Sequence, residues 1–372
     1  MFSVVLNIAG TLFHLYLAAR LHSLEAVRAR VSRRAWWTGA LLVWLLYIAG
    51  VHIGDAALDW RWWPGQFALT WLGISFVMSL GLLAADLAGG FGFWWRAHTQ
   101  TLRTLGAGGG VLLAVFALFQ GMRAPVIVEH EVHLRGLPQA LDGTVIAAVS
   151  DIHLGAQRRS AWLAARVAQI NALEPAAVLL LGDQVEDDPV GAPWLAPALR
   201  GLRAPLGVWA VTGNHEFYGE AETTVREFEA GGVRWLRDRR VELAPGLTLA
   251  GIEDVGRRMR SGGGYTEGLA RTLSTASPGA TILLAHIPAP ALIDAARERG
   301  VGLMLSGHTH GGQIWPFGYA VQQRFARYAG AYEVGGMRLY VTRGAGSWGP
   351  RMRLWRPGEI LRLTLRAAPA AL

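Results

Sequence analysis

The chain has 372 residues, 52% hydrophobic and 17% charged, so it is long enough for two domains and too apolar for an ordinary soluble enzyme. It contains no cysteine, which excludes disulfides, thiolate metal sites and cysteine nucleophiles, so any metal must be held by His, Asp, Glu or Asn. The net charge of +8 comes from scattered arginines with no lysine, and we expect no nucleic-acid partner.

Four long stretches without charged residues occupy the first third of the chain. Each has about the length that crosses the hydrocarbon core of a bilayer. They predict an all-α transmembrane region over residues 1–123, with helices at 2–19, 36–54, 66–85 and 105–122. The first stretch could also be a cleaved signal peptide, but it lacks a basic start, which favours its retention. We therefore expect a multi-pass protein of the cell membrane whose partner is the lipid bilayer.

The arginines predict how these helices are oriented, because cytoplasmic connectors carry an excess of them. The first connector contains Arg20, Arg28, Arg30, Arg33 and Arg34 against a single Glu25. The second connector contains Asp55, Asp59 and Arg61. The first connector is accordingly predicted to be cytoplasmic. With four spans, everything after Arg123 is predicted to lie on the outer, extracytoplasmic face.

From Pro125 onward, short apolar runs alternate with amphipathic or Gly/Pro-rich segments, the pattern of an α/β domain. This domain is predicted to cover residues 124–372. A helix is expected from Ser160 to about Leu173, where Pro175 ends it. The expected strands are Val126–His133, Thr144–Ser150, Ala177–Leu181, Val208–Thr212, Leu247–Gly251, Thr281–Ala285, Val301–Leu305, Arg338–Val341 and Ile360–Leu365.

Metal-ligating residue types follow five of these predicted strands. Ligands commonly gather at the carboxyl ends of strands in α/β sheets, so these side chains are expected to meet. The residues concerned are Asp151, His153, Asp183, Asn214, His215, His286, His308 and His310.

At these positions the chain resembles the calcineurin-like metallophosphoesterase superfamily, and within it the membrane-tethered bacterial branch. The resemblance implies a β-sandwich flanked by helices. Five motif blocks appear in order from Ser150 onward, which makes coincidence implausible. They are Asp151-Ile152-His153, Gly182-Asp183-Gln184-Val185-Glu186, Gly213-Asn214-His215-Glu216, Ala285-His286 and Gly307-His308-Thr309-His310.

The resemblance implies two divalent metal ions, one held by Asp151, His153 and His310, the other by Asn214, His286 and His308, with Asp183 bridging both. Imidazole and carboxylate ligands suit Mn, Fe, Zn or Co, and the sequence does not choose among them. By the same resemblance His215 is the general acid that protonates the leaving group. Whether Glu186 or Glu216 orients His215 stays open.

A basic loop is a weaker candidate for substrate binding. Arg257, Arg258 and Arg260 run into a glycine-rich segment, where they would either grip a phosphate group or remain solvated. Aromatic residues from Trp315 to Tyr332 follow the last His pair and would form either an apolar rim or part of the core.

These features together predict a two-metal phosphoester hydrolase, either a phosphodiesterase or a pyrophosphatase or phosphatase, that acts by in-line attack of a metal-activated water. A lipid-linked phosphate is the expected substrate, since the catalytic domain follows directly after a membrane span. The alternatives are a nuclease or nucleotide phosphodiesterase with a soluble substrate, and a non-catalytic membrane sensor or scaffold. The oligomeric state stays open.

Overall fold

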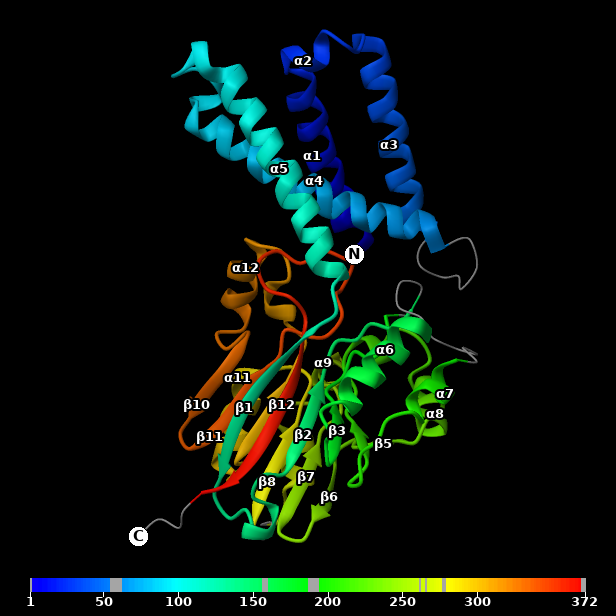
Figure 1. Ribbon diagram of the computed structural model, residues 1–372, viewed down its shortest axis with the longest axis vertical. Helices are drawn as coiled ribbons and strands as arrows, with labels where there is room; N and C mark the ends of the chain where they lie inside the picture. The colour runs from blue at the N-terminus through cyan, green and yellow to red at the C-terminus, as the bar shows by residue number, and fades with distance from the viewer. Residues whose placement is uncertain are drawn as a thin grey trace. The chain divides into compact units, whose positions relative to one another are not determined.

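The computed structural model describes residues 2–53, 62–155, 160–186, 194–260, 262–264, 266–275 and 279–368. Contacts divide the chain into two units (Figure 1): Met1–Arg123 with Gly349–Trp355, and Ala124–Trp348 with Arg356–Leu372. The predicted boundary at residue 123 therefore coincides with the main division, but one short C-terminal segment belongs to the first unit. The orientation residues Asp55, Asp59 and Arg61 lie outside the described residues.

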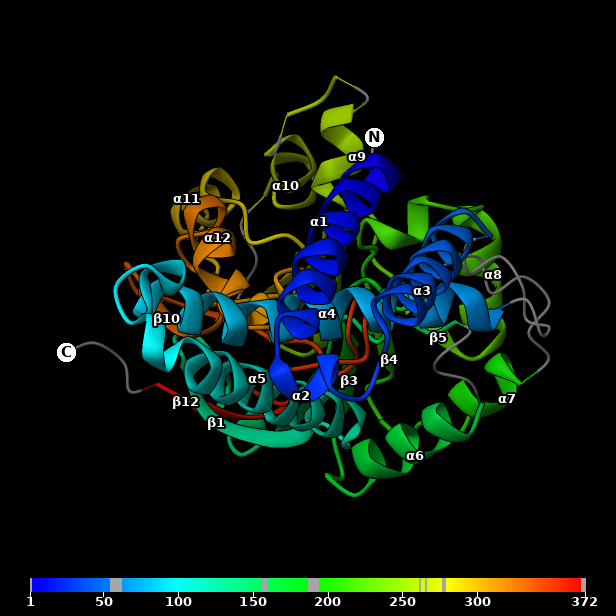
Figure 2. The ribbon, with the colours of Figure 1, turned by 90° about the horizontal axis from the view of Figure 1, so that it is seen from above.

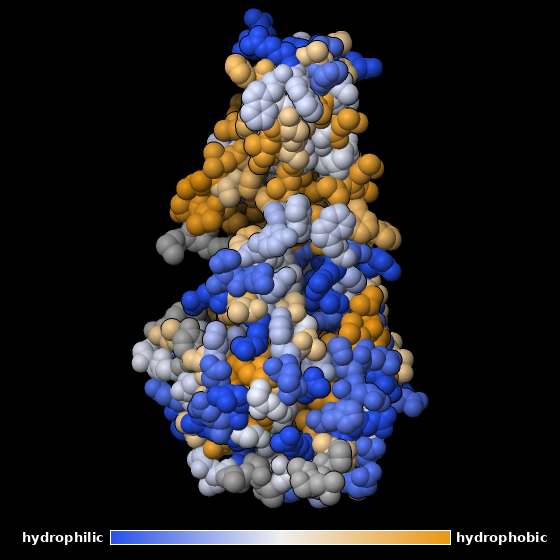
Figure 3. Space-filling model, turned by 90° about the vertical axis from the view of Figure 1, so that its left-hand side faces the viewer, coloured by the Kyte–Doolittle hydropathy of each residue, from blue (hydrophilic) through white to orange (hydrophobic). Residues whose placement is uncertain are grey.

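The first unit contains four long apolar helices at the predicted places. Each is long and apolar enough to cross a membrane, and hydrophobic side chains cover much of this unit's surface on the face shown in Figure 3. This composition makes the chain a membrane protein. The helices are α1 (Phe2–His22), α3 (Arg33–Ile53), α4 (Trp62–Ala88) and α5 (Thr99–Met122), with the short α2 (Glu25–Arg28), η1 (Gly90–Gly92) and η2 (Arg96–His98) between them.

Small residues let α4 and α5 pack closely. A Cβ added to Gly81 would lie 2.4 Å from the carbonyl oxygen of Gly106, and one added to Gly106 would lie 2.6 Å from that of Gly81. These glycines thus permit a backbone approach that larger residues would block. At the same end of α4, the buried carboxylate of Asp86 pairs with Arg20 at 2.6 Å and with Arg103 at 2.9 Å, which balances its charge.

The segment Gly349–Trp355 packs on α5, although sequence analysis places it in the second domain. The amide of Arg353 donates to the carbonyl of Ala117 at 2.9 Å, and the side chain of Gln120 donates to the carbonyl of Trp355 at 2.7 Å. The segment has no apolar periodicity that would identify such a role. Its backbone groups instead find two partners on the last turns of α5, one backbone carbonyl and one side-chain amide.

The second unit is built on two six-stranded sheets (Figure 1). The first has the strand order β1-β12-β2-β3-β4-β5, and the second has the order β10-β11-β9-β8-β7-β6. The first sheet comprises β1 (Val126–Leu134), β2 (Val145–Val149), β3 (Ala177–Leu180), β4 (Val208–Ala210), β5 (Val233–Trp235) and β12 (Glu359–Ala367). The second comprises β6 (Arg239–Ala244), β7 (Leu247–Gly251), β8 (Ala280–Leu284), β9 (Leu303–Ser306), β10 (Gly330–Val334) and β11 (Met337–Val341).

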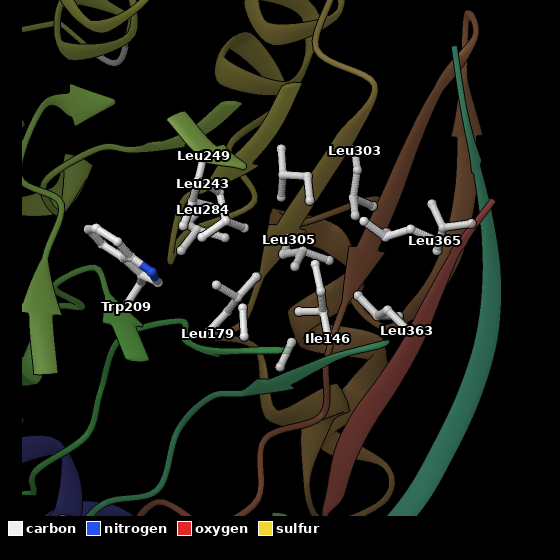
Figure 4. Packing of buried hydrophobic residues seen from close by; sticks show 14 of the residues in the cluster. Ile146, Leu179, Trp209, Leu243, Leu249, Leu284, Leu303, Leu305, Leu363 and Leu365 are labelled. Atoms are coloured by element: carbon white, nitrogen blue, oxygen red, sulfur yellow. The ribbon is translucent and has the colours of Figure 1, made fainter. Parts of the chain in front are cut away.

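The main core lies between the two sheets (Figure 4), where leucines and isoleucines from both inner faces meet. Helices cover the outer faces on opposite sides (Figure 2). The helices α6 (Ser160–Asn171), α7 (Leu195–Leu199) and α8 (Ala221–Ala230) pack on the first sheet, and α10 (Glu267–Thr272) and α11 (Pro290–Glu298) pack on the second. The predicted β-sandwich flanked by helices is confirmed.

Parallel strands at the centre of each sheet determine where the loops after them lie. In the first sheet β2, β3 and β4 are parallel neighbours, and in the second β7, β8 and β9 are. Their carboxyl ends therefore share one edge in each sheet. The residues that follow these strands are the ones that sequence analysis selects as metal ligands.

Candidate metal centre

The predicted ligands come together in a buried cluster, and residues that follow strands of both sheets contribute to it. Asp151 and His153 follow β2, Asp183 follows β3, and Asn214 and His215 follow β4; His286 follows β8, and His308 and His310 follow β9. Seven of these eight residues are buried, and His308 is partly exposed. Buried groups of this kind require partners or a bound ion.

The first set of potential ligands is Asp151, His153 and His310, whose ligand atoms lie within 4.8 Å of one another. The Nε2 atoms of the two histidines are 3.1 Å apart, and His310 Nε2 is 3.3 Å from Asp151 Oδ1. A carboxylate oxygen of Glu186 lies 2.5 Å from His153 Nδ1. A carboxylate on the far nitrogen is the usual support of a metal-binding histidine, because it leaves Nε2 free to bind the ion.

The second set is Asp183, His286 and His308, again within 4.8 Å. His286 Nδ1 contacts the carbonyl oxygen of Leu181 at 2.8 Å, and since a carbonyl only accepts, Nδ1 carries the proton. The opposite atom, Nε2, faces Asp183 Oδ2 at 3.1 Å. Without a metal ion a proton joins these two atoms, and a bound divalent cation would replace that proton, so the donor set fits a metal ion.

Asn214 directly precedes His215, whose backbone amide donates to Asp183 Oδ1 of the second set at 2.9 Å. The side-chain Nδ2 of Asn214 donates to the hydroxyl of Tyr218 at 2.9 Å, which turns the amide oxygen the other way. That oxygen is buried and has no hydrogen-bond partner among the described residues. A buried side-chain oxygen without a partner, on a residue that follows β4, is the second observation that fits a metal ion.

The charges of the cluster perturb its protonation. Burial raises the pKa of Asp151, whereas the imidazole of His286 overcomes burial at Asp183 and holds the pKa of that carboxyl well below its usual value. Against burial, Asp183 raises the pKa of His286 to about 10, while burial lowers the pKa of His308 to about 3. Groups with opposed shifts in one buried site are typical of functional centres.

The backbone of the cluster is strained. Five non-glycine residues have positive φ angles: Asp151 (52°), His153 (51°), Asp183 (51°), His308 (72°) and His310 (50°). This region of φ is sparsely populated for L-residues, and such strain persists only where the surrounding structure enforces it. The crowding is severe enough that a Cβ at Gly213 would lie 2.2 Å from Asp183 Oδ1.

Glu216 holds two of the ligand turns together. Its carboxylate accepts hydrogen bonds from the backbone amides of Gly213 at 2.6 Å, Gln184 at 2.7 Å and Asp183 at 3.0 Å. Burial and the charge of Asp183 raise the pKa of Glu216 to about 7. Glu216 therefore fixes the ends of β3 and β4 relative to each other.

His215 lies beside the first set, with its ring 4.6 Å from that of His153. Its Nδ1 contacts the backbone carbonyl of Glu186 at 3.1 Å. Of the two residues left open in the sequence, Glu186 thus orients His215, but through its main chain, while its carboxylate contacts His153. Because the carbonyl accepts, Nδ1 carries a proton and Nε2 is the atom that can exchange one with a ligand.

The three arginines of the basic loop have different surroundings in the structure. Arg257 lies in α9 (Val255–Arg260), and its guanidinium is 4.4 Å from the ring centroid of Phe217, two residues after His215. Both described arginines have acidic partners: Arg257 pairs with Glu253 at 3.1 Å, and Arg258 pairs with the half-buried Asp238. Their role as substrate ligands stays a prediction. Arg260 ends α9, and its side chain lies outside the described part.

Some residues of the aromatic stretch are exposed, and others pack against a metal-site histidine or the core. Trp315, Phe317 and Tyr319 are exposed, the last two on α12 (Phe317–Arg324). The ring of Phe325, in contrast, packs against His308 with centroids 5.4 Å apart, and Tyr332 packs on the core of the second sheet.

Sequence analysis missed Asp254, which follows β7 just as the other acids follow their strands. Asp254 is buried, and one of its oxygens accepts from the amide of Arg257 at 2.6 Å. Burial raises its pKa, partly offset by His286. The signal that could have found it is the pair Glu253-Asp254 directly after an apolar strand.

Two six-stranded sheets with helices outside, and two sets of His, Asp and Asn at their strand ends, define the metallophosphoesterase class. The family model of calcineurin-like phosphoesterases matches residues 144–312. The chain is 32% identical over 270 residues to a bovine (Bos taurus) transmembrane protein with metallophosphoesterase domain, covering 69% of this chain and 61% of that protein. An uncharacterised metallophosphoesterase of Campylobacter jejuni is 31% identical over 265 residues, covering 69% and 68%.

The chain belongs to the calcineurin-like phosphoesterase family. Its match spans about three fifths of the length of the bovine relative. Among solved structures, a dimetal phosphatase from Danio rerio matches 55% of this chain and 88% of its own at 13% identity with a TM-score of 0.35, which adds nothing to the assignment.

Proposed function

We propose that this protein is a membrane-anchored, metal-dependent phosphoester hydrolase that acts on a lipid-linked phosphate. The observation that carries the hydrolase assignment is the convergence of two ligand sets, each within 4.8 Å, at the strand ends of a calcineurin-like phosphoesterase. Asp151, His153 and His310 would hold one divalent ion, and Asn214, His286 and His308 the other, with Asp183 between them. Ions bound in such sites polarise phosphoryl oxygens and lower the pKa of water.

The chain's own residues supply proton transfer and orientation. His215, held at Nδ1 by the Glu186 carbonyl, donates a proton from Nε2 to the departing oxygen of the substrate. Arg257, stacked over Phe217 two residues further along, orients the phosphate through charge-assisted hydrogen bonds. Burial of the cluster strengthens these electrostatic interactions.

Two features support a lipid-linked substrate. Four membrane-type helices are more than a simple tether needs, and Trp315, Phe317 and Tyr319 are exposed large apolar side chains in the catalytic unit. Exposed aromatic residues are typical of surfaces that enter the lipid interface. A phosphodiester, pyrophosphate or phosphate head group would meet the metal centre while these side chains contact acyl chains.

Turnover assays on the purified full chain test the proposal. We expect hydrolysis of a soluble aryl phosphodiester that stops on chelation and returns with Mn²⁺ or another divalent ion. Absence of turnover with every metal would support a non-catalytic sensor instead, and salt-sensitive cleavage of DNA or RNA would support the nuclease alternative.

A second assay addresses the lipid part. The triple variant Trp315→Ser, Phe317→Ser, Tyr319→Ser should lose activity on lipid phosphates in bilayers and keep activity on the soluble aryl phosphodiester, which serves as the internal control. Equal activity of the variant and the wild type on both substrates would contradict the lipid assignment and leave the hydrolase assignment intact.

A further inference from the structure

The helical unit contains an apolar cavity of about 260 Å³ between α1, α3 and α4. Leu17 and Leu21 of α1, Gly39 and Val43 of α3, and Trp71 of α4 are among its lining residues. Its volume is below the ~300–1,000 Å³ usual for sites that hold a whole small molecule. The cavity therefore suits part of a slender ligand.

Two tryptophans line the cavity. The indole Nε1 of Trp36 donates to the carbonyl of Ala18 at 3.1 Å, and the indole Nε1 of Trp71 donates to His14 Nδ1 at 3.2 Å. Both indole donors are thus satisfied by protein atoms. The faces that remain are apolar, and an apolar cavity without polar partners does not hold ordered water.

Small residues create this space. Ala18, Ala35, Gly39 and Ala40 line it, and a Cβ added to Gly39 would meet no atom within 4 Å. Elsewhere α1 and α3 are joined by larger side chains, such as Tyr47, whose hydroxyl donates to the carbonyl of Leu6 at 2.5 Å. The cavity therefore exists only where small residues replace larger ones on α1 and α3.

The medium around such helices is hydrocarbon, because their length and composition are those of membrane spans. A cavity of this kind in hydrocarbon is filled by what surrounds it, namely the acyl chain of a lipid. Arg33 and Arg34 directly precede the lining residues Ala35 and Trp36 and form the exposed first turn of α3. Arginines at the membrane surface attract anionic head groups. The combination fits an anionic phospholipid.

We propose that the cavity between α1 and α3 binds one acyl chain of an anionic phospholipid, whose head group lies beside Arg33 and Arg34. This site is independent of the metal centre. The proposal does not depend on the proposed hydrolase activity, since its test measures lipid binding and not turnover.

The test uses the full chain in nanodiscs that contain phosphatidylglycerol with a photoreactive acyl chain, followed by mapping of labelled residues. We expect labelling at Leu17, Leu21 and Val43, reduced on the order of tenfold in Gly39→Phe, which fills the cavity. The matched control is Gly108→Phe on α5: this glycine is also exposed with no atom within 4 Å of an added Cβ, and it does not line the cavity. Labelling in the control should equal that of the wild type.

A second measurement is the number of phosphatidylglycerol molecules retained per chain in native mass spectra as detergent removes bulk lipid. The wild type should keep one that Gly39→Phe loses, and Arg33→Gln with Arg34→Gln should remove the preference for phosphatidylglycerol over phosphatidylcholine. Gly39→Leu replaces Gly39→Phe if the larger side chain prevents folding. Unchanged labelling and retention in both Gly39 variants would overturn the proposal, as would a change in oligomeric mass, which would assign the cavity to a second copy of the chain.

Discussion

At the scale of single residues, the site depends on which nitrogen of each histidine is already engaged. A carbonyl contacts Nδ1 of His215 and of His286, and a carboxylate contacts Nδ1 of His153. Each contact leaves Nε2 as the reactive atom. The same ring type thus serves as metal ligand or proton donor according to what its Nε2 faces.

His215→Ala should keep both metals and slow the reaction about 10²–10⁴-fold for alkyl phosphodiesters. Aryl phosphodiesters should be affected much less, because an aryl leaving group needs little protonation. Steady-state rates across leaving groups, together with metal analysis of the variant, check this. Loss of metal from His215→Ala would show that His215 is a ligand.

Arg257→Ala should raise KM for a phosphodiester about tenfold, equivalent to ~1.4 kcal/mol, with little change in kcat. The reason is that Arg257 stacks beside the site on Phe217 and would bind substrate and transition state alike. The matched control is Arg226→Gln, an exposed arginine of α8 whose guanidinium donates to Thr223 Oγ1 at 2.9 Å. An equal rise of KM in both variants would remove Arg257 from substrate binding.

At the scale of secondary-structure elements, Asp238 joins three segments. Its carboxylate pairs with Arg258 of α9 and with Arg271 of α10 at 2.9 Å, and accepts from the amide of Glu253 at 3.2 Å. Although burial opposes the charge, the hydrogen bonds from the arginines lower the pKa of Asp238. A lowered folded-state pKa stabilises the fold above the unfolded value of about 3.9, and this stabilisation is lost as the pH falls through the folded value.

Asp238→Asn should therefore reduce the free energy of unfolding by about 1–3 kcal/mol at neutral pH. The variant should also lose less stability than the wild type as the pH falls below about 4. Thermal unfolding and hydrogen exchange of the α9 and α10 amides measure both effects. Glu298→Gln is the control, because the Arg297–Glu298 pair is exposed and contributes little. Identical acid dependence in wild type and Asp238→Asn would contradict this account.

The strands that sequence analysis found include those with continuous apolar runs, such as β3, β8 and β9, which are buried along their whole length. It missed β5, β6 and β10, which are three of the four edge strands of the two sheets. Edge strands are short or carry charge, as in Arg239 and Arg240 of β6, so they lack the apolar run that marks a central strand.

The ligand residues could be selected from the sequence because parallel central strands bring their ends to one edge. The two contacts of Glu186 could not be predicted from the sequence, since its carboxylate contacts His153 and its backbone carbonyl contacts His215. Such a division depends on the path of the backbone after β3. Pairing between β1 and β12, which lie far apart in the chain, is likewise invisible to local patterns.

At the scale of the whole molecule, the arginine distribution predicts an extracytoplasmic catalytic unit. A phosphatase reporter fused after Leu372 should be active outside the cytoplasm, and one fused near Ala29 should be inactive, because the first connector carries the excess of arginine. The reverse pattern would place the catalytic unit in the cytoplasm and direct the substrate search to cytoplasmic lipid precursors.

The central claim is that two metal ions held by this cluster carry out phosphoester hydrolysis, and metal content measured alongside turnover tests it most directly. The full chain should contain two equivalents of divalent metal, lose activity when stripped and regain it with the metal. Asp183→Ala should lose more metal and activity than any other single ligand substitution, because Asp183 is the ligand proposed to lie between both ions. Turnover that survives complete removal of metal, or full metal content in Asp183→Ala, would contradict the account.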